Sequence, residues 1–364
     1  MKKIICCLMA AVMIFMAGCS AQRPREENTD GLSVITQRLD MCTFYGDEKG
    51  CYRIISDENN IRLSYIDFET NREELIKEKL EVSSVSAPFI FVADERIYLH
   101  TALFTEDSST VTSTLTHLAP DGAVVSQTIF PENNSIGMEL VRDNDFLYTM
   151  LYNRDAKIAT LIRINKADMI YEMLADFSLA AQIVTVHEDS IIVQNGSKII
   201  SYDTVTEQQS VLPVENNVDG KRIGRWYGIG GKLFAVQGNY SKLETFDIPS
   251  EVQYAEQIDS PGMLAEFTVG NDCLIPGCLF LYTRSEITNE MMIHYMDAAT
   301  MKVVKTIKAA DFAWQYPVAR CGDKLLVVEI KQGTYPFVYE YKVCLLSDYL
   351  NGEENYTVIK MLDS

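Results

Sequence analysis

The hexapeptide DERIYL at 94–99 joins a polar turn directly to an apolar strand, and related stretches return along the chain. The copies read DNDFLY at 143–148, EDSIIV at 188–193, GGKLFA at 230–235, NDCLI at 271–275 and GDKLLV at 322–327, with a weaker copy at 46–54. Successive copies lie about 40 to 50 residues apart, which is the spacing of repeated four-stranded units. The chain from residue 32 onward is therefore predicted to consist of repeated small sheets.

A second marker lies between these turns, where a strand ends at an Asp and a Thr or Ser follows. It reads YIDFETN at 65–71, SYDTVTE at 201–207, TFDIPS at 245–250 and YMDAAT at 295–300, with variants LAPDG at 118–122 and INKAD at 164–168. Such an Asp accepts a hydrogen bond from the backbone N–H two residues on, and Asn71 and Gly122 suit a left-handed turn residue. The third strand of each unit is predicted to end at the Asp, and the fourth to begin after the Thr.

The composition favours β structure, because the chain has 19 Tyr and 15 Phe and few segments of helical period. One four-stranded sheet cannot bury both of its faces, whereas sheets stacked around an axis bury them, and a closed ring leaves no end face exposed. We therefore predict an all-β fold, a β-propeller of about seven four-stranded blades over 34–362, although six or eight blades also fit the spacing. The segment 32–39 is a candidate to complete the last blade and lock the ring.

Two other folds compete with this prediction. A pair of β-sandwiches is the rival, since it also uses short strands joined by turns. An α/β solute-binding fold is disfavoured because long amphipathic helices are missing. The best helical candidate is the Glu- and Lys-rich segment 71–82, and a helix there is the weaker alternative.

The strand-Asp-x-x-Thr units resemble the repeats of bacterial quinoprotein-like and YVTN-type β-propellers. This resemblance covers nearly all of 32–364 and implies a propeller scaffold. Quinone-binding members of that family also carry a Trp after the Thr-Gly turn of each blade. This chain has two Trp, Trp226 and Trp314, and neither follows such a turn. No quinone or other cofactor is therefore expected.

The N-terminus has the form of a secretory signal. Lys2 and Lys3 precede the apolar run 4–15, which at about twelve residues is too short to span a bilayer as a helix. The run ends in Met16-Ala17-Gly18-Cys19, which resembles the lipobox of bacterial lipoproteins apart from Met16, where that family usually has Leu. In that family the Cys thiol receives a diacylglyceryl group, and cleavage makes the Cys the new N-terminus. The alternative is an ordinary N-terminal helix with a chance cysteine.

The resemblance divides the chain into a lipoprotein signal peptide at 1–18, a lipidated Cys19 with a flexible tether at 19–31, and a propeller domain at 32–364. Two acyl chains give stable membrane anchoring. The tether prediction rests on the polar, charged composition of 20–31, which lacks a hydrophobic period. The expected location is the extracytoplasmic face of a cell membrane.

The net charge limits the classes of partner that the protein is expected to bind. The formal charge of the whole chain is −19, and loss of Lys2 and Lys3 with the signal makes it −21. An acidic protein repels phosphate backbones, so nucleic acid is excluded as an expected partner. Solubility is the simplest role for this charge.

Six cysteines remain after the signal and Cys19 are set aside: Cys42, Cys51, Cys273, Cys278, Cys321 and Cys344. Cys42 and Cys51 flank a turn-like stretch and could face each other across a hairpin as a disulfide, which an extracytoplasmic location permits. Buried thiols acting as small apolar side chains are the equal alternative. No pair has Cys-x-x-Cys spacing, so a zinc site is not indicated.

No catalytic or metal-ligating pattern stands out. The four histidines, His100, His117, His187 and His294, have no metal-ligand spacing and are predicted to be strand residues. Asp143-Asn144-Asp145 lacks the spaced ligands and the Gly of a calcium loop and is predicted to be a turn. Gly228-Ile229-Gly230-Gly231 has no helix after it to bind phosphate and is predicted to be a turn between strands. We assign no catalytic residue and expect no metal.

Aromatic and basic side chains are the remaining indication of function. Arg225, Trp226 and Tyr227 precede one turn-strand unit and Trp314 and Tyr316 precede another, with Arg222 and Arg320 nearby. Such mixtures are enriched at binding hot spots, so these residues are candidates for a binding rim, with packing between blades as the alternative.

The favoured function is a membrane-anchored, non-enzymatic binding or scaffold module for a protein or a glycan. An extracellular glycan-acting hydrolase or lyase with carboxylates at the central channel is the alternative. A sensory or assembly subunit of an envelope complex is a third hypothesis.

Overall fold

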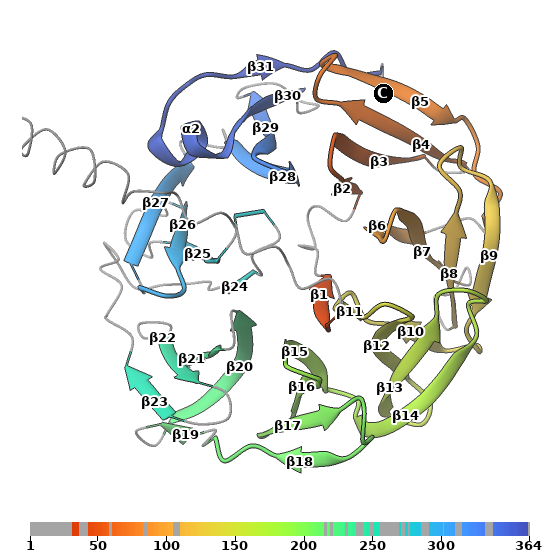
Figure 1. Ribbon diagram of the computed structural model, residues 1–364, viewed down its shortest axis with the longest axis vertical. Helices are drawn as coiled ribbons and strands as arrows, with labels where there is room; N and C mark the ends of the chain where they lie inside the picture. Colours follow the sequence, from red (N-terminus) through yellow and green to blue (C-terminus); the bar gives the residue numbers. More distant parts are fainter. Residues whose placement is uncertain are drawn as a thin grey trace, which may run out of the picture. The chain divides into compact units, whose positions relative to one another are not determined.

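The computed structural model of the protein describes residues 31–35, 43–57, 60–82, 86–104, 110–214, 217–218, 221–229, 232–237, 243–247, 251–254, 269–270, 274–275, 277–284, 291–300, 302–309, 315–331 and 338–362. By its internal contacts the chain divides into two compact units, 1–31 and 32–364. The second unit is built almost wholly from antiparallel strands, and Figure 1 shows its sheets in succession around a central axis.

The described strands form six hydrogen-bonded sheets. The first contains β2 (Phe44–Gly46), β3 (Gly50–Asp57), β4 (Asn60–Asp67) and β5 (Arg72–Lys77). The largest has ten strands and includes two antiparallel meanders. One meander is β6 (Ser86–Ala93), β7 (Arg96–Phe104), β8 (Val111–Leu118) and β9 (Val124–Ile129). The other is β11 (Leu140–Arg142), β12 (Phe146–Asn153), β13 (Ile158–Asn165) and β14 (Tyr171–Ser178). The short β10 (Asn134–Ile136) pairs with β8 and β12 and so joins the two.

The remaining sheets repeat the meander. One has β15 (Gln182–His187), β16 (Ser190–Asn195), β17 (Lys198–Asp203) and β18 (Gln209–Val211). The next has β19 (Asn217–Val218), β20 (Lys221–Ile229), β21 (Lys232–Gln237), β22 (Leu243–Asp247) and β23 (Glu251–Tyr254). It is followed by β24 (Val269–Gly270), β25 (Cys278–Arg284), β26 (Met291–Asp297) and β27 (Lys302–Ala309). The last has β28 (Gln315–Cys321), β29 (Lys324–Lys331), β30 (Val338–Leu345) and β31 (Thr357–Val358).

Helical structure is confined, in the described part of the chain, to short pieces such as α2 (Leu346–Asn351), which lies between β30 and β31. The weaker alternative of a helix at 71–82 is wrong, because Arg72–Lys77 forms β5 and pairs with β4 from Asp67↔Arg72 onward. Pairing with a neighbouring strand outweighs the helix propensity of Glu and Lys there. No helix among the described residues has both the length and the apolar character needed to cross a membrane.

The turn chemistry predicted from the strand-ending Asp is confirmed. Asp67 Oδ1 accepts hydrogen bonds from the backbone N–H of Glu69 (2.7 Å) and Thr70 (3.1 Å), and Asp203 Oδ1 accepts those of Val205 (2.9 Å) and Thr206 (2.7 Å). The third strands β4, β17 and β26 end at Asp67, Asp203 and Asp297 as expected. Asn71 (φ 56°) and Gly122 (φ 77°) adopt the left-handed conformation.

In five of the units, a backbone hydrogen bond ties two turns together at one end of the strands. The residue after the third strand donates its N–H to the carbonyl at the turn before the second strand. The pairs are Phe68 to Lys49 (3.3 Å), Lys166 to Asp145 (2.9 Å), Thr204 to Asp189 (2.8 Å), Ala298 to Gly277 (2.8 Å) and Leu346 to Asp323 (2.7 Å). Both kinds of turn therefore lie on one face of the sheet assembly, which we call the turn face.

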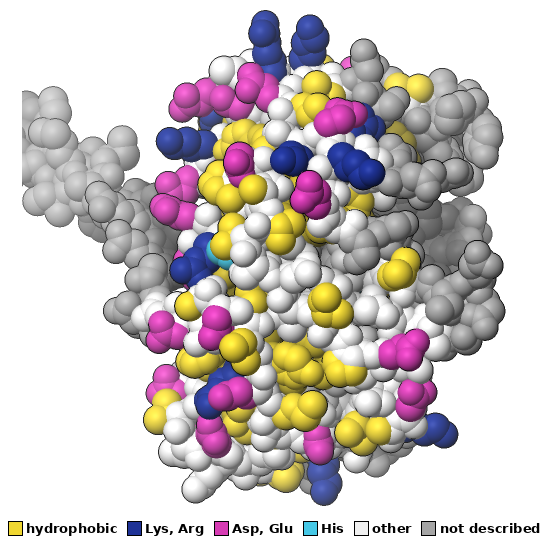
Figure 2. Space-filling model, turned by 90° about the vertical axis from the view of Figure 1, so that its right-hand side faces the viewer, with side chains coloured by type: hydrophobic (Ala, Val, Ile, Leu, Met, Phe, Trp, Pro, Cys, Tyr) yellow, Lys and Arg dark blue, Asp and Glu magenta, His cyan; other side chains and the backbone are white. Residues whose placement is uncertain are grey.

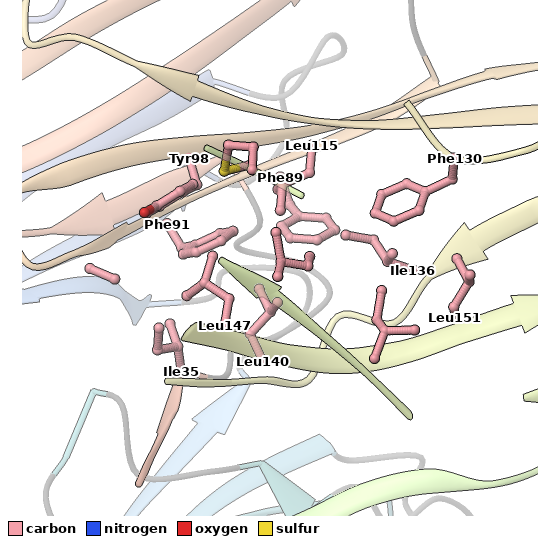
Figure 3. Close-up of a cluster of buried hydrophobic side chains, with 14 residues drawn as sticks. Ile35, Phe89, Phe91, Tyr98, Leu115, Phe130, Ile136, Leu140, Leu147 and Leu151 are labelled. Atoms are coloured by element: carbon pink, nitrogen blue, oxygen red, sulfur yellow. The ribbon is translucent and has the colours of Figure 1, made fainter. Parts of the chain in front are cut away.

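Apolar side chains fill the space between successive sheets. Ile90 and Leu99 pack against Ile54 and Leu63 on one side of the β6–β9 meander. On its other side, Phe91 and Tyr98 belong to a cluster with residues of β11–β13, shown in Figure 3. Further clusters join β11–β14 to β15–β18, then β15–β18 to Trp226 and Leu233, and β24–β27 to β28–β31. Among the described residues, the meanders β6–β9, β11–β14 and β15–β18 are each covered on both faces, which a pair of β-sandwiches would not provide.

The last sheet packs against the first, so the succession of sheets returns to its start. Val318, Ala319 and Leu326 share a buried cluster with Cys51 and Ile66. At the inner strands the two sheets approach so closely that a Cβ on Gly46 would lie 1.7 Å from the Arg320 carbonyl oxygen. The structure thus confirms an all-β, propeller-like fold.

The C-terminal residues, rather than the segment 32–39, complete this junction. Lys360 N–H donates to Asn71 O (3.0 Å), Glu73 N–H donates to Lys360 O (3.0 Å), and Ile359 packs in the shared cluster. The prediction that 32–39 completes the last blade is wrong, because β1 (Ser33–Ile35) pairs with β11 in the ten-stranded sheet. Residues 36–39 lie outside the described part of the chain.

A buried ion pair holds the same junction. Glu73 accepts hydrogen bonds from Arg53 Nη1 (3.1 and 3.0 Å) and from the Leu362 backbone N–H (2.9 Å). The Arg53 guanidinium also lies 5.5 Å from the Phe44 ring and 5.4 Å from the Tyr341 ring, so it bridges the first and last sheets. The carboxylate fixes the C-terminal residues onto the outer strand β5.

Candidate functional site

Trp226, predicted as part of a binding rim, lies in the core. Its side chain is 1% exposed and packs with Val184 and Ile192 of the preceding sheet. Its backbone N–H donates to Gln194 Oε1 (3.0 Å), which fixes β20 against the same sheet. The rim prediction is therefore wrong for Trp226, and the alternative of packing between blades holds.

The other rim candidates remain predictions. Arg225 and Tyr227 lie in β20 and Tyr316 in β28, at backbone register with Val236, Phe234 and Val328, and their side chains lie outside what the structure describes. Trp314 lies outside the described residues altogether. Arg320 is described, and its Nε donates to the Gly322 carbonyl (3.1 Å) next to a turn.

The outer surface carries apolar side chains that the sequence analysis did not single out. On and beside β9 and β14 the exposed residues are Val125, Ile129, Ile170 and Met173, each 57–65% exposed. Figure 2 shows this side of the molecule, with apolar side chains interspersed among acidic and basic ones. Period-2 alternation in the outermost strands signals such residues, but the sequence does not show which strand is outermost.

All four histidines lie in strands, as predicted. His100 Nε2 is hydrogen-bonded with Ser113 Oγ, and its ring stacks on Phe89 at 4.5 Å. Burial lowers the pKa of His100 to about 3, so the imidazole is neutral at ordinary pH. Burial also lowers the pKa of His294, whose Nδ1 lies 2.9 Å from Thr306 Oγ1. Both rings are buried within their sheets and hydrogen-bonded to a neighbouring hydroxyl.

The described cysteines are buried free thiols: Cys51, Cys278, Cys321 and Cys344. Burial raises the pKa of Cys321 and of Cys344 to about 11, and that of Cys51 well above its usual range, so none of these three thiols is a ready nucleophile. The pairing of Cys42 with Cys51 stays a prediction, because Cys42 lies outside the described residues.

Asp143-Asn144-Asp145 forms the turn between β11 and β12, as predicted. Asp143 Oδ1 accepts the N–H of Asp145 (2.8 Å) and Phe146 (2.6 Å), and Oδ2 accepts the Tyr148 hydroxyl (2.7 Å). Its oxygens are thus used in fixing the turn. Among the described residues, no group of His, Cys, Asp and Glu has an arrangement that could hold a metal ion.

A charged cluster on the turn face holds β1 in place. Arg142 donates from Nε to Ser33 Oγ (3.0 Å) and from Nη1 to Asp94 Oδ1 (2.8 Å). Lys166, whose side chain is 3% exposed, pairs with the same Asp94 and donates to the Asp143 and Asn144 carbonyls. The buried ammonium therefore has one charge partner and two carbonyl acceptors. We call these four residues, Ser33, Asp94, Arg142 and Lys166, the turn-face clamp.

The turn-face clamp was not predicted from the sequence, although one residue points to it. Lys166 follows the strand-ending Asn165, at the position that Phe68, Thr204 and Ala298 occupy in other units. A single charged residue among apolar and small ones at one repeat position indicates a local ion pair. Its partner Asp94 belongs to the preceding meander, which only the fold reveals.

The comparisons with known proteins give no family. No protein-family model matches the chain, and no curated protein matches it.

Solved structures with similar coordinates do exist. The WD40 domain of SCAP from fission yeast matches with 13% identity and a TM-score of 0.49, over 94% of this chain and 89% of that one. A protein from Lactobacillus plantarum matches with 14% identity and a TM-score of 0.42, over 72% of this chain and 83% of that one. An acylaminoacyl peptidase from Pyrococcus horikoshii matches with 12% identity and a TM-score of 0.48, over 77% of this chain. This chain spans about half of that peptidase, covering 48% of it.

Proposed function

We propose that this protein is a lipid-anchored, extracytoplasmic β-propeller that binds a protein or a glycan without catalysing a reaction on it. One observation carries the non-enzymatic part of the proposal. Each of the four buried Glu, His and Lys side chains that the structure describes has a structural partner. The partners are Arg53 for Glu73, Ser113 for His100, Thr306 for His294 and Asp94 for Lys166. These groups stabilise the scaffold and are not free for acid–base catalysis.

We infer that the propeller has seven blades. The ten-stranded sheet contains two meanders, β6–β9 and β11–β14, each with its own apolar contacts to the next sheet. Counted separately and added to the other five sheets, they give the predicted number. The link β10 contributes a single parallel pair to β8, which is a weaker connection than the pairing inside each meander.

The anchor rests on the lipobox-like sequence at 16–19. The full-length chain produced in a bacterial host should fractionate with membranes, and its Cys19 should carry acyl chains detectable by mass spectrometry. Cys19→Ala should leave an unprocessed precursor or release the protein from membranes. Cys7→Ala, which changes a thiol inside the signal, is the matched control and should behave as the wild type. Unchanged membrane association of Cys19→Ala would refute the anchor.

The binding role needs a separate experiment. The lipidated full chain, crosslinked in native envelopes and also applied to an array of bacterial glycans, should retain a partner that is recovered chemically unchanged. Shortened or unsaturated glycan products would instead establish the hydrolase or lyase alternative. Mass analysis of the recovered glycan distinguishes the two results.

A further inference from the structure

The strand β1 shows where the chain passes into the second unit. Its antiparallel register with β11 places Ser33 opposite Arg142 and Ile35 opposite Leu140. Arg142 is the last residue of β11 before the turn at Asp143–Asp145. The chain therefore arrives at the turn face and runs from there toward the other end of the strands.

This arrival point is firmly fixed. The turn-face clamp holds Ser33 through Arg142, which is itself held by Asp94 and, through it, by Lys166. On either side of Ser33, Leu32 and Val34 pack against the cluster between β11–β14 and β15–β18. Ile35 is buried in the cluster on the other side of β11–β14. Residues 32–35 thus contact the clusters on both sides of the β11–β14 meander.

The twelve residues from 20 to 31 set a limit on how the ring can stand on a membrane. Fully extended, they span at most about 40 Å. To place the opposite face toward the bilayer outside the ring, they must first pass the four strands β11 to β14, about 19 Å, and then the length of an eight-residue strand, about 26 Å. That path is longer than the extended segment, so the segment would not reach the bilayer. A path back between the inner strands is disfavoured because it would take the charges of this segment out of bulk water. The charged residues concerned are Arg23, Arg25, Glu26, Glu27 and Asp30.

The negative charge of the turn face keeps this face a short distance from anionic headgroups but does not turn it away from the bilayer. Asp47, Asp67, Asp94, Asp143 and Asp203 lie at its turns, and backbone N–H groups lower the pKa of Asp67 and Asp203. Repulsion between these carboxylates and anionic headgroups acts over about 8 Å at physiological salt. This distance is well within the span of the tether.

We propose that the turn face looks toward the lipid bilayer and that the opposite ends of the strands point away from it. This orientation rests on the lipidation of Cys19 proposed above. It places the turns at 154–157 and 196–197 on the side away from the bilayer and the acidic turns next to the headgroups.

Paired labels at the two ends of one strand test the orientation. Val205→Cys lies at the turn face after β17, and Ser197→Cys lies at the other end of the same strand, both at exposed positions. Ala167→Cys and Ala156→Cys form a second pair at the two ends of β13. Each lipidated full-length variant, labelled with a donor dye and bound to phosphatidylethanolamine–phosphatidylglycerol vesicles, reports energy transfer to a headgroup-labelled acceptor lipid. The parent chain without an added cysteine gives the background from native thiols.

Transfer from position 205 should exceed that from 197, and transfer from 167 should exceed that from 156. Equal transfer within both pairs, or the reverse order, would overturn the orientation while leaving the anchor intact. Flotation of each sample with its vesicles is measured first. A wild-type chain that does not float would overturn the lipid anchor, and this proposal with it.

Discussion

Strand-ending aspartates fix the turns of this protein residue by residue. Asp67, Asp203 and Asp297 each accept a hydrogen bond from a backbone N–H two or three residues on, so a few adjacent residues determine the turn geometry. This is why the sequence predicts these turns correctly. The prediction of an exposed rim fails at Trp226, because the burial of this side chain depends on residues of the neighbouring sheet that are distant in sequence.

His100 gives the protein a pH dependence of its own. Burial lowers its pKa from 6.5 to about 3, so the folded state resists protonation that the unfolded chain accepts. The stability this neutral ring allows is fully present above pH 6.5 and falls as the pH drops toward 3, by about 1.4 kcal/mol per pH unit. His100→Gln should remove this slope between pH 6 and 4 in urea unfolding experiments. An identical slope in the variant would contradict the assignment.

The two tryptophans should respond differently to truncation. Trp226→Ala removes a buried side chain between sheets and should cost about 3–5 kcal/mol of unfolding free energy. Trp314→Ala should weaken partner capture while the melting temperature stays unchanged, if Trp314 belongs to a binding rim. Thermal unfolding measures the first effect, and capture from native envelopes measures the second. A large drop in the melting temperature of Trp314→Ala would place that side chain in the core.

Among the structural elements, the ends of the strands follow the local sequence pattern more closely than the pairing between strands does. β4, β17 and β26 end where the sequence predicts, because their bounds depend on turn residues. The fate of the terminal segments was not predictable in this way. β1 and the residues after β31 carry little sequence signal, and each found its place through contacts with distant strands, β11 and β5.

The C-terminal junction should depend on Glu73. Glu73→Gln keeps the shape of the side chain but leaves Arg53 without its charge partner, so the unfolding free energy should fall by about 3–5 kcal/mol. The adjacent Glu74 is exposed, and Glu74→Gln serves as the matched control with a change near zero. Urea unfolding measures both. Equal effects of the two variants would show that the buried pair does not hold the junction.

On the scale of the whole molecule, the ring explains how a fold built from small sheets buries its apolar side chains. Each sheet is too small to bury its own faces, and the last one supplies the apolar surface that the first one lacks. The period of the turn-strand units predicts this arrangement, since equal units tile most simply around an axis. The chemistry of binding has no such period, which is why the rim residues were harder to identify.

Removal of the last sheet tests this closure. A chain ending at Lys308 lacks β28–β31 and exposes the apolar side chains that pack against them, including Cys51, Ile66 and Tyr295. It should fail to fold, and circular dichroism with thermal melting should show no cooperative transition. A soluble fragment that melts cooperatively would indicate independently folding domains instead.

The sequence alone determined the class of fold, the repeat, the turns and the strand ends, because these follow from residues close together in the chain. Only the tertiary structure decided which sheet edge takes β1, which residues complete the ring, and that Trp226 and Lys166 are buried. Those outcomes depend on pairings across more than one repeat. The energy of such a contact depends on two segments that are far apart in the chain, so it cannot be inferred from either segment alone.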